Sequence, residues 1–198
     1  MSLELFNSLA TFGTFLVISA TAIAAVVQLR HMRSANQIEG INYAQASLES
    51  PEYHVARNYI ISEFAKKWED PAFRHQLGNR STRTSENQAL ITHIMLVGDA
   101  HEQLGLLVKR GLIERDMALD LFSANALIAW EKLSAVTVAL RRAGGNTVWE
   151  NFEYFVVQAQ DWEAAHPDGA YPPGVRRIAL KDELREADEQ YAASLRTE

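Results

Sequence analysis

The chain has 198 residues and a mass of 22.2 kDa, a length that suits one compact domain with an added segment and is too short for two full domains. Hydrophobic residues make up 47% and charged residues 22%, which is typical of a folded protein. The net charge of -6 argues against a nucleic-acid partner, because phosphate binding needs a basic surface. The lack of cysteine excludes disulfide scaffolds, thiolate zinc sites, iron–sulfur clusters and cysteine nucleophiles.

The N-terminal part of the chain is a candidate membrane span. Leu5–Leu29 contains no charged residue, and as a helix it would be about 37 Å long, against a hydrocarbon core of about 30 Å. Glu4 precedes this stretch, whereas Arg30, His31 and Arg33 follow it at once. Positive charge is retained on the cytoplasmic side. The sequence therefore predicts a single-pass protein of the inner (cytoplasmic) membrane, with its N-terminus outside and its C-terminal domain in the cytoplasm.

Two other interpretations of this segment stay open. Ala20-Thr21-Ala22 and Ala22-Ile23-Ala24 resemble the small-residue cleavage sites of a signal peptide, but the chain begins Met-Ser-Leu-Glu and lacks the positive n-region that a signal peptide needs. A buried helix of a water-soluble protein is the second alternative. The length of the apolar run favours a retained anchor over both.

Small and polar side chains recur along the span at the spacing of a helix–helix seam. Asn7, Thr14, Thr21 and Gln28 lie seven residues apart, and Ala10, Val17 and Ala24 lie three residues after the first three of them. This is the a/d pattern of a left-handed seam, and in lipid such residues allow close backbone approach. We therefore expect the lipid bilayer as one partner, and a second copy or another membrane-protein subunit as the other. Alternatively, the hydroxyls bond to their own backbone, or several copies place the polar residues around a pore.

The remainder of the chain has the periodicity of helices, with start signals such as Ser50-Pro51. We expect helices over residues 30–48, 51–68, 71–78, 86–110, 115–122, 123–142, 147–165 and 180–195. No convincing alternation typical of strands appears in the sequence. The predicted fold class is all-α, a single N-terminal transmembrane helix followed by a cytoplasmic helical bundle. The anchor covers residues 1–33, the bundle 34–166, and a loop with an amphipathic helix 167–198.

The basic pairs and the histidines do not indicate a cofactor site. Lys109-Arg110 and Arg141-Arg142 each stand in the last turn of a predicted helix before glycine, where cations complement the helix dipole. Glu163-x-x-His166 has the ligand spacing of di-iron bundles, but that architecture needs a second copy of the motif and two further carboxylates. We therefore predict no metal and no cofactor.

Four residues form a candidate buried polar cluster on otherwise apolar helix faces: Glu102, Glu131, Trp149 and Glu153. Acids that converge in a bundle interior hold their protons more tightly and can act as acid/base groups. The structural alternative pairs each acid with Arg141, Arg142, or a tryptophan or tyrosine donor. Gly98 and Gly105 lie on the stripe of Glu102 and suggest a close helix crossing.

Five segments follow one another along the chain: QLRHMR, SPEYHVAR, HEQLGLLVKRGLI, IAWEKL and VWENFEYF. In this order they resemble a bacterial family of small membrane-anchored proteins known only as a domain of unknown function. The likeness covers about Val27 to Trp162 and does not extend to the C-terminal tail. Carried over by residue, it points to Glu102, Leu104, Gly105, Gly111, Trp130, Glu131, Trp149, Asn151, Phe152, Glu153 and Tyr154. The resemblance implies an anchored helical protein and brings no activity, substrate or cofactor.

The leading prediction for function is a non-enzymatic assembly or interaction subunit, either a homo-oligomer or an accessory subunit of a larger membrane complex. It rests on the polar seam, on the lack of a recognisable catalytic motif in the sequence and on the amphipathic C-terminal helix. The alternatives are an enzyme or ligand-binding module that uses the buried acids, and a pore-lining oligomer.

Overall fold

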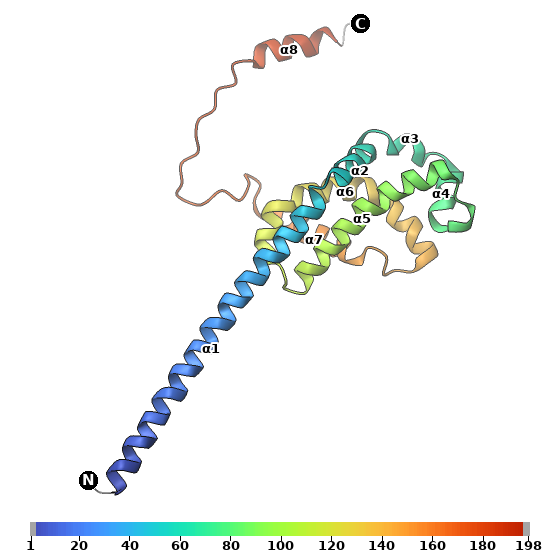
Figure 1. Ribbon diagram of the computed structural model, residues 1–198. Coiled ribbons are helices and arrows are strands. Elements are labelled where there is room, and N and C mark those ends of the chain that lie inside the picture. Colours follow the sequence, from blue (N-terminus) through green and yellow to red (C-terminus); the bar gives the residue numbers. More distant parts are fainter. Residues whose placement is uncertain (1–2, 196–198) are drawn as a thin grey trace. The chain divides into compact units, whose positions relative to one another are not determined.

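The computed structural model describes residues 3–195, and the side chains of all of these except residues 5 and 6. Its helices are α1 (Leu3–Leu48), α2 (Pro51–Ser62), α3 (Phe64–Trp68), α4 (Pro71–Gly78), the 3-10 helix η1 (Arg80–Thr82), α5 (Ser85–Lys109), α6 (Arg115–Gly144), α7 (Glu150–Ala165) and α8 (Arg185–Ser194) (Figure 1). No strand occurs in the described range, which confirms the predicted all-α class. Residues up to Pro167 form one compact unit, and those from Asp168 onward form another. Residues 1–2 and 196–198, at the ends of the predicted anchor and tail, lie outside the described residues.

Helix α1 runs without a break from the apolar N-terminal stretch through Leu48. The described side chains from Leu3 to Asn36 are exposed, apart from half-buried Ser19. Among the described residues one helix, over Asn7–Leu48, is long and apolar enough to span a membrane, and an 18-residue window within it has a mean hydropathy of 2.0. A signal sequence near an N-terminus meets the same requirement.

The C-terminal turns of α1 pack into the bundle. Ile41, Ala44 and Leu48, at intervals of three and four residues, are buried. Just before them, a Cβ on Gly40 would stand 2.9 Å from Cγ1 of Ile113, so this glycine lets α1 lie close against the chain between α5 and α6. The apolar stretch is therefore joined to the bundle by continuous helix.

Short polar residues start the helices of the middle region, as the sequence predicts. The Ser50 hydroxyl accepts a hydrogen bond from the Tyr53 amide at 3.1 Å, and the Asp70 carboxylate accepts one from the Ala72 amide at 2.8 Å. A proline follows each cap at the first helical position, where its missing N–H is no loss. The helix predicted over 51–68 is divided at Glu63 into α2 and α3.

Helix α6 corrects one prediction. The sequence indicates a helix start at Ser123, but α6 continues through this residue from Arg115 to Gly144, and Ser123 is buried within it. The true start is capped by Glu114, whose carboxylate oxygens accept from the amides of Asp116 at 3.1 Å and Met117 at 2.7 Å. Serine lowers helix propensity only slightly, so the unbroken core stripe on both sides of Ser123 decides its conformation.

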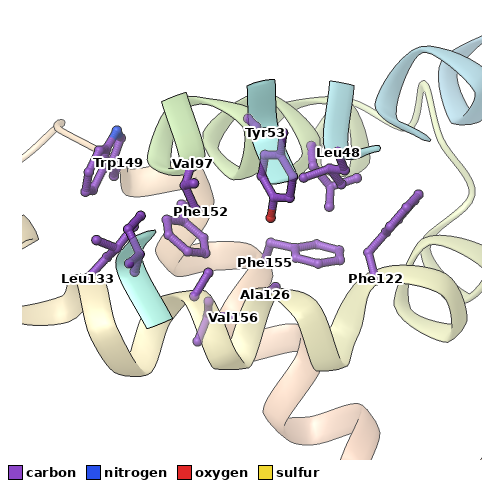
Figure 2. Packing of buried hydrophobic residues seen from close by; sticks show 14 of the residues in the cluster. Leu48, Tyr53, Val97, Phe122, Ala126, Leu133, Trp149, Phe152, Phe155 and Val156 are labelled. Atoms are coloured by element: carbon purple, nitrogen blue, oxygen red, sulfur yellow. The ribbon is translucent and has the colours of Figure 1, made fainter. Parts of the chain in front are cut away.

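The core lies where α2, α5, α6 and α7 meet, and aromatic rings fill much of it (Figure 2). Phe152 of α7 is fully buried, and its ring stacks on His101 of α5 with 4.7 Å between centroids. The ring of Trp130 from α6 is nearly perpendicular to the Phe152 ring, with 5.0 Å between the two centroids. Phe155 of α7 and Tyr53 of α2 are also fully buried. Because large rings remove the most apolar surface from water, α7 contributes much of the cohesion of the bundle.

The unit that begins at Asp168 is exposed throughout its described residues and contains α8. The helix predicted over 180–195 forms only in its later part, Arg185–Ser194. Before α8 the guanidinium of Arg177 lies 4.7 Å from the centre of the Tyr171 ring, a cation–π contact within the unit.

Replacing Leu133 with alanine should lower the free energy of unfolding by about 2–5 kcal/mol, because Leu133 is fully buried and its truncation leaves a cavity. Leu121 on the same helix is 55% exposed, so Leu121→Ala should change that free energy by less than about 0.5 kcal/mol. Chemical denaturation of the detergent-solubilised chain, followed by circular dichroism, measures both. Equal effects would show that α6 presents a different face to the core.

Candidate functional site

The predicted acid Glu102 caps the N-terminus of α7. Its carboxylate accepts hydrogen bonds from the backbone amides of Asn151 at 2.9 Å and Phe152 at 2.8 Å, and from Nδ2 of Asn151 at 2.7 Å. The first amides of a helix lack a partner within it, and the dipole at that end favours a negative charge. The residue at the N-cap position of α7 is Trp149, whose indole has no oxygen acceptor. Half-buried Glu102 therefore supplies the cap from α5.

Two glycines let α5 come close enough for this contact. Gly98, Glu102 and Gly105 follow one another at four and three residues, so they share one face of α5. A Cβ on Gly98 would stand 2.0 Å from the Trp149 ring, and one on Gly105 would stand 2.0 Å from the carbonyl oxygen of Asn151. The predicted close helix crossing is confirmed, and its partner is the N-terminus of α7.

Trp149 is the residue at which the chain turns into α7. Its backbone is left-handed, with φ 53° and ψ 37°, a conformation that residues other than glycine rarely adopt. The residue is 3% exposed, and its Nε1 donates to the Asp99 carboxylate at 2.9 Å. The helix predicted from Thr147 therefore begins after this turn, at Glu150. Burial of the indole against Gly98 holds the turn in place.

Lys109 joins this contact from the last turn of α5. Its Nζ donates to Oδ1 of Asn151 at 3.0 Å and lies 3.6 Å from the Glu150 carboxylate. Asn151 is thus held by Glu102 through its amide nitrogen and by Lys109 through its amide oxygen. In the sequence, Lys109 stands at a helix end, and the helix dipole is a sufficient reason for a cation there. Its contact with α7 could therefore not be predicted from the sequence.

Glu153 pairs with Arg141, as the structural alternative predicts. The two side chains meet at 2.7 Å between the Arg141 Nη2 and the Glu153 carboxylate. The Nε of Arg141 also donates to the Val148 carbonyl at 2.9 Å, which fixes the segment between α6 and α7. One arginine therefore braces both the turn and the helix that follows it.

Glu131 lies apart from the other candidate residues. Its side chain is 68% exposed and pairs with Lys132 at 2.6 Å. The structure brings Glu102, Trp149 and Glu153 to the start of α7, each with its own partner, and leaves Glu131 on the outer surface of α6. The candidate buried cluster is thus corrected: Glu131 lies outside it because α6 turns a different apolar stripe toward the core, and the Glu153 side chain is 47% exposed.

The seam residues of α1 are exposed along the helix. The Thr14 hydroxyl donates to the Ala10 carbonyl at 2.9 Å, and the Thr21 hydroxyl donates to the Val17 carbonyl at 2.8 Å. The remaining seam residues, Asn7, Ala24 and Gln28, are exposed as well. The hydroxyls thus bond to their own backbone, as the alternative predicts, and contact of this face with another helix stays a prediction.

Within residues 3–195 no group of three or more histidine, cysteine, aspartate or glutamate side chains is placed to hold a metal ion. His166, from the Glu-x-x-His spacing, donates from Nδ1 to the Trp162 carbonyl at 2.9 Å. Its ring also lies 4.0 Å from the Trp162 ring, between centroids. These contacts place His166 at the C-terminal end of α7, where it packs on Trp162.

His101 is a buried titratable group that the candidate cluster omits. Its Nδ1 donates to the Val97 carbonyl at 2.8 Å, while Nε2 is buried with no hydrogen-bond partner in the described part of the chain. Burial lowers its pKa to about 4, although the bond to Val97 opposes this shift; the charge of Arg57 lowers the pKa further. The sequence signal for its burial was its position, because His101 falls on the apolar stripe of α5. The ring is neutral at neutral pH.

Hollows with volumes between about 360 and 410 Å³ open on the described part of the bundle surface, and two of them have a volume of about 380 Å³. One lies between α4 and the end of α6, where Arg74 and Arg142 line it. The other lies between α2 and α6, where Tyr53, Arg57 and Asn125 line it. Both have the size of small-molecule sites, and the sequence singled out neither.

These features define an all-α protein in which an apolar N-terminal helix continues into a bundle, and in which the last bundle helix is capped from a neighbouring helix. The chain belongs to the family described as a domain of unknown function (DUF4760), whose model matches residues 15–159. The matched range begins inside α1 and ends inside α7, so it includes the bundle and part of the apolar stretch. The chain matches no curated protein and no solved structure.

Replacing Glu102 with glutamine should lower the free energy of unfolding by about 1–3 kcal/mol, because the amide cannot accept all three hydrogen bonds and carries no charge. The matched control is Glu131→Gln, which removes an exposed pair and should cost less than about 1 kcal/mol. Denaturant titration of both variants measures the difference. If the two substitutions destabilise equally, the capping role assigned to Glu102 is wrong.

The free energy of unfolding should also decrease as the pH is lowered, because of His101. The unfolded ring takes up a proton near pH 6.5, whereas the folded ring does so only near pH 4, so between these values the unfolded state binds more protons. The loss from pH 7 to pH 4 is about 3 kcal/mol, and the contribution levels off about one pH unit below the folded pKa, where the ring is protonated in both states. His101→Leu should remove it, measured as the difference between the two chains in denaturant titrations at pH 7 and pH 4.5. Parallel pH profiles would contradict the assignment.

Proposed function

We propose that the protein is a single-pass membrane protein of the inner (cytoplasmic) membrane, with its N-terminus outside and its bundle in the cytoplasm. It serves as a non-enzymatic assembly subunit, either as a homo-oligomer or within a larger membrane complex. The observation that carries the proposal is the continuity of α1, whose exposed apolar stretch passes without a break into turns that are buried in the bundle. Pairing of two such spans would bring their bundles together.

Two properties of α1 support a retained anchor. Large apolar side chains from Leu9 to Leu29 are exposed along it, and they need an apolar surrounding that the bundle does not give them. The helix also continues through Ala20, Ala22 and Ala24, so the small residues that resemble a cleavage site lie within a regular helix.

A second apolar surface supports assembly through the bundle. We call it the α6 outer face; its exposed residues are Met117, Leu121, Ala124, Ile128, Glu131, Ala135 and Val138. They follow one another at alternating intervals of four and three, which is the spacing of a seam between two helices. Exposed large apolar side chains on a rigid helix are typical of an interaction site. A helix of another subunit is the partner that this spacing favours.

The contacts of the candidate acids favour assembly over acid/base catalysis. Glu102 accepts three hydrogen bonds from the start of α7, and Glu153 pairs with Arg141, so both carboxylates have fixed partners. In the pore alternative, the hydroxyls of Thr14 and Thr21 would serve a line of ions or water only as acceptors, because they donate to their own helix.

Replacing Thr14 and Thr21 together with leucine should reduce the mass of the complex extracted in mild detergent, since the larger side chains separate the two backbones at the seam. Native mass spectrometry of material taken from its own membrane reports copy number and partners together. We expect a complex of at least two chains for the unsubstituted protein and a shift toward the single chain for the variant.

The matched control is Thr11→Leu. Thr11 is exposed as well, and its hydroxyl donates to the Asn7 carbonyl at 2.9 Å, but it lies outside the seven-residue series. Its substitution should leave the mass unchanged. An unsubstituted protein that is strictly monomeric and brings no partner would overturn the proposal.

A further inference from the structure

The hollow between α2 and α6 has a volume of about 380 Å³ and lies beside the end of α1. Tyr53 and Arg57 line it from α2, Asn125 lines it from α6, and Leu48 lines it from α1. A place where three helices meet is a common position for a small-molecule site, because the backbone around it is rigid.

A relay of neutral groups holds Arg57 in this hollow. The Nε of Arg57 donates to Oδ1 of Asn125 at 3.0 Å, and Nδ2 of Asn125 donates to the hydroxyl of fully buried Tyr53 at 3.1 Å. The relay fixes the plane of the guanidinium through one edge. Nη1 and Nη2 have no hydrogen-bond or ion-pair partner among the residues that the structure describes. Two adjacent N–H groups in this geometry match the two oxygens of a carboxylate.

No acid among the described residues forms an ion pair with Arg57. Glu49 lines the same hollow, but its carboxylate accepts from Nε2 of Gln45 at 3.0 Å and forms no ion pair with Arg57 in the described structure. Burial raises the pKa of Tyr53 above its usual value of 10.0 and lowers that of His101 to about 4, so both rings are neutral at neutral pH. A half-buried guanidinium whose Nη1 and Nη2 have no ion-pair partner in the described structure favours an anion from outside the chain.

Apart from His54, apolar side chains form the rest of the wall. Leu121 is 55% exposed and Ile128 is 41% exposed, and Phe122 lies between them in sequence on the same helix. Exposed apolar groups beside a fixed cation suit a ligand with an acid head and an apolar body.

We propose that this hollow is a binding site for a small organic carboxylate, with the acid on Nη1 and Nη2 of Arg57 and the apolar body against Leu121 and Ile128. The site is additional to the assembly role, although Leu121 and Ile128 belong both to its wall and to the α6 outer face. The polar relay from Tyr53 through Asn125 positions the guanidinium, and the ligand supplies the counter-charge that the chain does not.

Calorimetric titration of the full chain in detergent tests the proposal with three probes. Benzoate has the acid and the apolar ring, benzylamine has the ring with the opposite charge, and inorganic phosphate has the anion alone. We expect saturable binding of benzoate at concentrations up to about 10 mM, which is the range of a weak site, and none of benzylamine. Absence of saturable benzoate binding, or binding of benzylamine as tight as that of benzoate, would overturn the proposal. Phosphate binding as tight as that of benzoate would overturn the role of the apolar wall.

Two variants and a control locate the site. Arg57→Gln should weaken benzoate binding at least about tenfold, because the two charge-assisted hydrogen bonds are lost. Asn125→Asp should weaken benzoate binding to a similar degree, because the new carboxylate would neutralise the Arg57 guanidinium in place of benzoate. This variant keeps Arg57 and a partner for it, so it tests the site even if Arg57→Gln does not fold. Arg142→Gln removes an arginine of the other hollow and should leave binding unchanged. Unaltered binding in both Arg57→Gln and Asn125→Asp would place benzoate elsewhere and overturn the assignment.

Discussion

Helix α7 carries rings that fill the core, yet its first amides depend on a carboxylate from another helix. The chain enters α7 through a left-handed tryptophan, which cannot accept the hydrogen bonds that a serine or aspartate would accept at the same place. Glu102 fulfils this need from α5, and the adjacent glycines allow the approach. If these amides were buried without an acceptor, each would cost about 1–3 kcal/mol, which the packing of Phe152 and Phe155 would have to offset. The position of α7 is therefore set by one electrostatic contact as much as by its apolar face.

The sequence predicts well those features that neighbouring residues determine. Ser50 and Asp70 begin helices because each can accept a bond from an amide two or three residues on, and this chemistry is visible in a short segment. The close crossing at Gly98 and Gly105 is predictable for a similar reason, since small residues on one face of a helix leave room for a backbone. The sequence does not show that this backbone belongs to the start of α7, because the partner lies in a distant segment.

The candidate site was less predictable, and α6 shows why. This helix has two stripes at intervals of three and four residues, one through Leu133 and Val136 and one through Leu121, Ile128 and Glu131. Their composition is similar, so periodicity alone does not tell which stripe faces the core. The contacts of α7 decide, and they bury Leu133 and leave Glu131 outside. An acid on an apolar stripe is therefore a sign of a site only when the stripe is known to be buried.

The outward stripe of α6 is shared by the two interactions that we propose for the bundle. Leu121 and Ile128 belong to the α6 outer face and also line the hollow beside Arg57. A partner helix that packs on this face must contact or displace whatever lies against these two side chains. The proposed binding in the hollow and the proposed assembly through α6 would then not be independent, and by linkage each would alter the free energy of the other by the same amount. In the proposed assembly, the continuity of α1 with the bundle would extend this connection to the apolar stretch, because a change in how the bundles pack would change the separation of the helices that leave them.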